Sequence, residues 1–163
     1  MPIYYHISLG DKFNVTKDFS NNLKNGKKLF FAKKNSFWYN FWKKIGKEDI
    51  KSYAEYKINI PEKLFTSSFH PKDEKILRIT NTNIKEYLET ENKVSKLSKL
   101  RDITFMRKNN IIGVDLNTQD VLDYPKKHKF QLGASSCEGW LYKFDDIKCV
   151  KVGIYKNGVL KKL

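Results

Sequence analysis

Runs of apolar residues and alternating polar and apolar positions predict strands near both ends of the chain and helices between them. Ile3–Ser8 is a β-favouring run closed by a glycine, and Leu29–Ala32 is a compact apolar run, so both are expected to be strands. Ser36 is a typical helix N-cap residue, and the aromatic-rich segment after it predicts a helix that ends near Gly46. Residues 53–60 alternate, which predicts a strand with one solvent-facing side.

That solvent-facing side carries Tyr53, Glu55, Lys57 and Asn59. Further along, residues 83–100 place apolar side chains near helical spacing, and residues 120–130 form a loop or a short helix broken by Pro125. An edge segment is expected at residues 64–65, and strands at residues 111–116, 140–144 and 147–155. Asn157-Gly158 is a hairpin signal. Strands at both ends with helices between them predict an α+β fold.

The length and hydropathy of the chain fit one soluble domain over residues 1–163. A chain of 163 residues lies within the usual range of about 100–200 residues for one domain. No stretch approaches the roughly 18 uninterrupted apolar residues of a membrane span, and the first ten residues do not resemble a secretory signal. We therefore expect a cytoplasmic monomer without a membrane partner.

The net charge of +14 comes almost entirely from lysine, since only Arg78, Arg101 and Arg107 are arginines. Such a charge attracts polyanions, but dedicated phosphate and base readers favour the bidentate fork of arginine. The basic surface is therefore either a polyanion-binding face or compositional background, and it excludes mimicry of DNA, which needs acidic residues. The two cysteines and three histidines lack zinc-ligand spacing, so no metal site is expected.

Three features could carry chemistry, and each also has a purely structural explanation. His6 and Ser8 are two residues apart in a predicted strand, so both side chains face one side and can bind one ligand. The aromatic rings from Phe30 into the following helix could sandwich a planar heteroaromatic ring, or they could all be core. Glu138 stands at the start of a strand beside Gly139, where a carboxylate can stabilise positive charge or simply face water.

Taken together and in order, these segments resemble the ADP-ribosyltransferase fold. The segments that carry the resemblance are Tyr5-His6-Ile7-Ser8, Leu29-Phe30-Phe31-Ala32 after Gly26, Tyr56-Lys57-Ile58-Asn59-Ile60-Pro61, Asn110-Ile111-Ile112-Gly113-Val114-Asp115, and Glu138 followed by Phe144-Asp145-Asp146-Ile147. The resemblance covers most of the chain through short, degenerate motifs. The order and spacing of the segments also resemble those of small phage-encoded members of the family, some of which modify bacterial CRISPR effector complexes. The resemblance implies two small, mainly antiparallel sheets around a cleft for NAD.

The resemblance also implies a role for each matching residue. His6 would hold the adenosine ribose of NAD, Ser8 would support the nicotinamide ribose or the first strand, and the backbone of Ile7 would bind the carboxamide. Phe30, which stands where many members have tyrosine, would stack on nicotinamide. Phe41, or one of its neighbours Trp38 and Trp42, would supply the second ring. Glu138 would be the catalytic glutamate that contacts the ribose 2′-hydroxyl.

These roles predict a mono-ADP-ribosyltransferase that uses NAD and modifies a macromolecule. The acceptor is either a host protein in a nucleoprotein complex or nucleic acid itself, and a phage or mobile-element effector with an anti-CRISPR-like role fits the size, composition and resemblance. A second class of function stays open, namely a non-enzymatic basic module that inhibits a nucleic-acid-bound complex. In that case His6, Phe30 and Glu138 are structural and the lysines provide the affinity.

Overall fold

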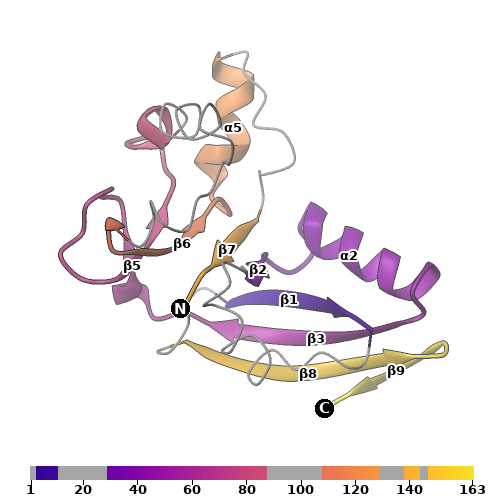
Figure 1. Cartoon of the computed structure of the whole chain (residues 1–163). Helices are drawn as coiled ribbons and strands as arrows, with labels where there is room; N and C mark the ends of the chain where they lie inside the picture. Colours follow the sequence, from indigo (N-terminus) through magenta and orange to yellow (C-terminus); the bar gives the residue numbers. More distant parts are fainter. Residues whose placement is uncertain (1–2, 11–28, 88–107, 129–137, 144–146) are drawn as a thin grey trace.

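Two β-sheets make up the strand content of the computed structural model, which describes residues 3–10, 29–87, 108–128, 138–143 and 147–163 (Figure 1). The first sheet is antiparallel throughout, in the spatial order β1 (Ile3–Leu9), β3 (Ser52–Asn59), β8 (Lys148–Lys156), β9 (Val159–Lys162). The second has the order β2 (Leu29–Phe31), β7 (Gly139–Leu141), β6 (Ile111–Asp115), β5 (Lys75–Arg78), β4 (Phe65–Thr66). Strands β2, β7 and β6 are antiparallel, and β6, β5 and β4 are parallel. The expected α+β fold with two mostly antiparallel sheets is confirmed.

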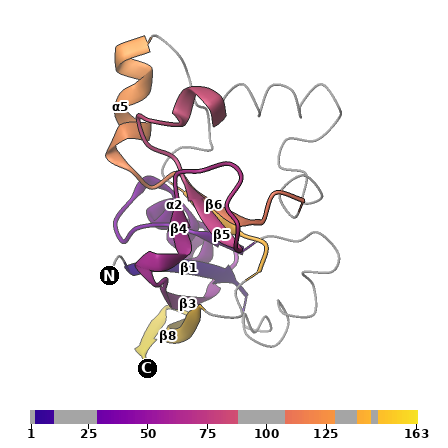
Figure 2. The same cartoon turned by 90° about the vertical axis from the view of Figure 1, so that its left-hand side faces the viewer.

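Helices cover the sheets at separate places. Helix α2 (Phe37–Glu48) packs on β1 and β3 of the first sheet. The short 3₁₀ helix η2 (Glu62–Leu64) leads from β3 into β4, and α5 (Gln119–His128) follows β6. Seen from the side, strands β8, β3 and β1 lie in succession below the second sheet, and α5 lies at the far end (Figure 2).

Local sequence signals agree with the structure where one face of an element decides its conformation. The strands expected at Ile3–Ser8, Leu29–Ala32 and 111–116 correspond to β1, β2 and β6 within one residue at each end. Ser36 occupies the N-cap of α2, as expected. Asn157 and Gly158 both have positive φ, at 52° and 84°, which is the backbone twist that a two-residue hairpin between β8 and β9 requires.

Tyr53 corrects the prediction of a wet face along residues 53–60. Glu55, Lys57 and Asn59 are partly exposed, but Tyr53 is 1% exposed, because α2 covers this end of β3. The same contact explains why the helix does not end at Gly46. A Cβ on Gly46 would lie 2.7 Å from Cδ1 of Tyr53, so the glycine allows close packing inside the helix, which continues to Glu48.

Pro125 does not break the segment in which it lies. The backbone stays helical from Gln119 to His128, although a proline nitrogen cannot donate a helical hydrogen bond. Several expectations fall outside the described residues: the irregular segment 11–25, the helical stretch from residue 88 to 100, and positions 137 and 144–146. Residues 84–87, at the start of the expected helix, are helical.

The apolar core formed by the described residues has three parts, and the third positions the candidate site. One lies between the two sheets and contains Tyr4, Phe31 and Ile58, while another lies between the second sheet and the segments that flank it. The third lies between α2 and the first sheet, with Ile7, Ala32, Tyr39 and Tyr53 buried and Trp38 and Trp42 packed against them. Helix α2 is therefore held by aromatic side chains over the edge of the first sheet.

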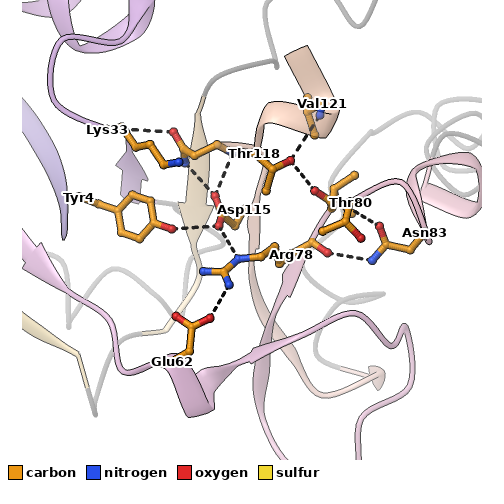
Figure 3. A network of polar contacts seen from close by, with 11 residues as sticks. Tyr4, Lys33, Glu62, Arg78, Thr80, Asn83, Asp115, Thr118 and Val121 are labelled. Carbon is orange, nitrogen blue, oxygen red and sulfur yellow. Dashed lines mark hydrogen bonds and ion pairs between the residues drawn. The ribbon is translucent and has the colours of Figure 1, made fainter. Parts of the chain in front are cut away.

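A buried carboxylate joins the two sheets (Figure 3). Asp115 at the end of β6 is 1% exposed, and its Oδ2 accepts from the Tyr4 hydroxyl of β1 at 3.1 Å and from Arg78 Nε at 3.2 Å. Its Oδ1 accepts from the backbone and side-chain amides of Asn117, both at 2.9 Å. The guanidinium of Arg78 also donates to Glu62 at 2.6 Å. Because each oxygen of Asp115 is hydrogen-bonded, this charge can stay buried and lock β1 against the second sheet.

Candidate functional site

The edges of the two sheets meet where β1 passes the end of β2. Tyr5 donates its backbone N–H to Ala32 at 2.8 Å and accepts from the Ala32 N–H at 2.9 Å. Backbone groups two residues apart in a strand point to the same edge. The N–H and C=O of Ile7 therefore point toward the edge that Tyr5 uses for Ala32, and away from β3.

A cavity of about 290 Å³ opens at this junction, between β1, the end of β2, the start of β7 and helix α2. The residues that line it come from segments far apart in the sequence. They are Tyr5, His6, Ile7, Ser8, Leu9, Phe30, Phe31, Ala32, Trp38, Tyr39, Trp42 and Glu138. The cavity thus brings together His6, Ile7, Ser8, Phe30 and Glu138, which sequence analysis proposed as one site.

His6 is held in one tautomer by the neighbouring strand. Its Nδ1 lies 2.6 Å from the backbone carbonyl oxygen of Phe30, and this carbonyl can only accept a hydrogen bond. Nδ1 therefore carries the proton and Nε2 is left as an acceptor. Burial lowers the pKa of His6 to about 4, against the opposing effect of the Phe30 carbonyl. The ring is thus neutral near pH 7 and suited to accept a hydrogen bond from a ligand hydroxyl.

The low pKa of His6 predicts a pH-dependent loss of stability. The unfolded chain, with a histidine pKa of about 6.5, binds a proton below that pH, whereas the folded chain does not until about pH 4. Stability from this group is therefore present above pH 6.5 and falls as the pH drops toward 4. We expect the free energy of unfolding, measured by urea denaturation, to fall about 1–2 kcal/mol less between pH 7 and pH 5 in His6→Gln than in the wild type. An equal fall in both proteins would contradict this, and His70→Gln, at an exposed histidine, is the matched control.

Glu138 is placed by a close approach of two strands. Its backbone carbonyl accepts from Leu116 N–H at 3.0 Å, and the next residue, Gly139, pairs with Phe31 of β2 and Asp115 of β6. A Cβ on Gly139 would overlap the ring of Phe31, so only glycine lets β7 approach β2 this closely. Glu138 is 8% exposed and lines the same cavity as the aromatic residues Phe30, Trp38 and Trp42.

Aromatic rings form most of the remaining wall, but Phe41 is not among them. Phe30 of β2 lines the cavity, and α2 contributes Trp38 and Trp42. Phe41 is 38% exposed on another side of the same helix. Of the three rings considered for the second stacking position, the structure thus brings Trp38 and Trp42 to the cavity and leaves Phe41 outside it.

Tyr39 supports this wall and was not anticipated from the sequence. Its hydroxyl donates to Glu55 of β3, and burial followed by the contact with Glu55 raises the pKa of Tyr39. Lys43, one helical turn later, lies 3.8 Å from the same carboxylate. The spacing of four residues between Tyr39 and Lys43 places both on one side of a helix, and this could have been seen in the sequence. Their shared partner Glu55 can be identified only once β3 is known to lie beneath α2.

Comparison of the chain with protein-family models, with curated protein sequences and with solved structures gives no significant match. Within the described residues, no three His, Cys, Asp or Glu side chains are grouped so that they could hold a metal ion. No described helix has the length and apolar character needed to cross a membrane. The function of the cavity is therefore inferred from its own geometry.

Proposed function

We propose that the protein is an ADP-ribosyltransferase that cleaves NAD in this cavity and transfers ADP-ribose to a macromolecule. The observation that carries the proposal is the meeting of His6, Ile7, Phe30 and Glu138 around one cavity, from strands β1 and β2 and from the residue that precedes β7. These residues were chosen from short motifs along the chain. Their convergence is what a shared substrate would require.

The cavity suits the nicotinamide riboside end of NAD. At about 290 Å³ it is just below the roughly 300–1,000 Å³ typical of ligand sites, so we place a ring and a sugar in it and not the whole dinucleotide. Phe30, Trp38 and Trp42 offer flat apolar surfaces to a planar ring. The N–H of Ile7 can donate to the carbonyl oxygen of a carboxamide, and the C=O of Ile7 can accept from its amino group.

Glu138 supplies the charge that the reaction needs. When the bond between the ribose C1′ and the nicotinamide nitrogen breaks, the electron pair goes to the ring nitrogen and positive charge develops on the ribose. A carboxylate fixed in an apolar cavity stabilises that charge more strongly than one in water. The lone pair of an acceptor atom then bonds to C1′, and its proton leaves to solvent, which gives ADP-ribosyl acceptor and free nicotinamide.

The proposal is tested with NAD labelled in the adenylate part and incubated with the full chain and a bacterial lysate. Released nicotinamide is measured by chromatography, and transferred label is measured on the macromolecules of the lysate. We expect both signals with the wild type and neither with Glu138→Ala. Absence of nicotinamide release with every lysate, or label transfer that survives the loss of Glu138, would overturn the proposal and favour a non-enzymatic binding module.

A further inference from the structure

Helix α2 displays aromatic rings to solvent next to the cavity. Phe37 is 64% exposed and Phe41 is 38% exposed, and their rings are stacked, with centroids 6.0 Å apart and planes 15° from parallel. Trp38 and Trp42 extend the same aromatic surface to the cavity wall. Neighbouring aromatic side chains that are exposed to water often mark an interaction site, so this pair is a candidate binding surface.

The flank of the same helix that adjoins Phe37 and Phe41 on the side away from Trp38 and Trp42 is basic. A groove of about 330 Å³ runs along it and is lined by Asn40, Lys43, Lys44 and Lys47 among others, with Glu48 as its one carboxylate. With about 100° of rotation per residue, Lys44 falls beside Phe37 and Phe41, and Asn40 and Lys47 lie further round. The Lys43 ammonium lies 3.8 Å from Glu55, and the Lys47 ammonium lies 6.0 Å from the centroid of the Tyr155 ring, but the side chains of Lys44 and Lys47 are both exposed. An aromatic strip thus borders a strip of lysines and an asparagine.

We propose that this surface of α2 binds single-stranded nucleic acid, with bases stacked on Phe37 and Phe41 and phosphates near Lys44 and Lys47. Aromatic side chains beside a positively charged groove are the two elements by which proteins hold single strands without reading sequence. A protein partner would be served by the aromatic rings alone, and the adjoining lysines favour a polyanion. A duplex keeps its base faces stacked inside the helix, so only an unpaired strand can use both strips.

The contribution of stacking is measured by fluorescence anisotropy with labelled single-stranded DNA, single-stranded RNA and duplex DNA, in the absence of NAD. We expect the wild type to bind both single strands more tightly than the duplex, and Phe37→Ala/Phe41→Ala to weaken single-strand binding about 30-fold or more. The matched control is Val159→Ala/Leu160→Ala, two exposed apolar residues on β9, which should bind like the wild type.

The contribution of the lysines is measured from the salt dependence of the same binding. Lys44→Gln/Lys47→Gln should make the slope of log K against log salt shallower by about 1.4, since each phosphate contact on a single strand contributes about 0.7. The control Lys161→Gln/Lys162→Gln changes two lysines of β9, away from α2, and should leave the slope unchanged.

Three results would overturn the proposal: no binding of either single strand at low salt, equal binding of duplex, or equal effects of the α2 and β9 variants. Circular dichroism verifies that each variant is folded. We expect all of them to fold because every substituted side chain is exposed. Because NAD is absent, failure of this binding leaves the NAD-cleaving proposal intact, and failure of NAD cleavage leaves this one intact.

Discussion

Replacing Glu138 by Gln is expected to lower the rate of nicotinamide release about 10²–10³-fold. Glutamine keeps the size of the side chain and can still form hydrogen bonds, so the wall of the cavity stays filled. What it loses is the negative charge of the side chain, and in the proposed reaction that charge is needed in the transition state and not for binding the neutral parts of the substrate. The loss should therefore appear in kcat, with little change in KM.

The measurement is the initial rate of nicotinamide release at several NAD concentrations, with the wild type and the variant at the same protein concentration. Glu86→Gln makes the same chemical change at an exposed glutamate that does not line the cavity, and it should retain the wild-type rate. Equal rates for wild type and Glu138→Gln would show that the carboxylate is structural. A loss confined to KM would mean that Glu138 binds substrate but does not stabilise the transition state.

Local patterns were sufficient to predict elements whose conformation depends on neighbouring residues alone. The strand at Ile3–Ser8 and the hairpin at Asn157-Gly158 are of this kind, since alternation and turn chemistry act over a few residues. Tyr53 and Gly46 are different. Their environment is set by α2 lying on β3, a contact that alternation along β3 does not encode.

The candidate site shows the same division. His6, Phe30 and Glu138 could be proposed from short motifs because each stands at a recognisable place in its own segment. The choice among Trp38, Phe41 and Trp42 could not be made, because the aromatic stripes of α2 are all spaced by three or four residues. Only the packing of Tyr39 and Gly46 against the first sheet decides which stripe faces inward.

The polar network around Asp115 could not be predicted from the sequence. Tyr4 and Asp115 are 111 positions apart, and nothing near either residue identifies the other. The motif that contains Asp115 indicated only a buried strand, and a carboxylate at the end of such a strand is compatible with either a catalytic or a structural role. Its four hydrogen-bond donors are the Tyr4 hydroxyl, Arg78 Nε and the backbone and side-chain amides of Asn117.

Replacing Asp115 by Ala is expected to lower the free energy of unfolding by about 3 kcal/mol, near the low end of what breaking a buried ion pair costs. The variant leaves the hydroxyl of Tyr4 and the amide of Asn117 buried without their acceptor, and each such group is costly. The penalty stays near that end because Arg78 keeps its second carboxylate, Glu62, at 2.6 Å. Urea denaturation followed by circular dichroism gives the value.

Glu62→Ala is the matched control, because it removes the other carboxylate partner of the same guanidinium. The side chain of Glu62 is 60% exposed, whereas that of Asp115 is 1% exposed, so the surface pair should contribute less than about 1 kcal/mol. If the two variants lose equal stability, burial of Asp115 is not what makes the contact strong. A double-mutant cycle that combines Tyr4→Phe with Asp115→Ala isolates the coupling free energy of the contact that joins β1 to the second sheet. Coupling between Tyr4 and Asp115 of about 1 kcal/mol would mean that β1, which carries His6, is held in place by this carboxylate.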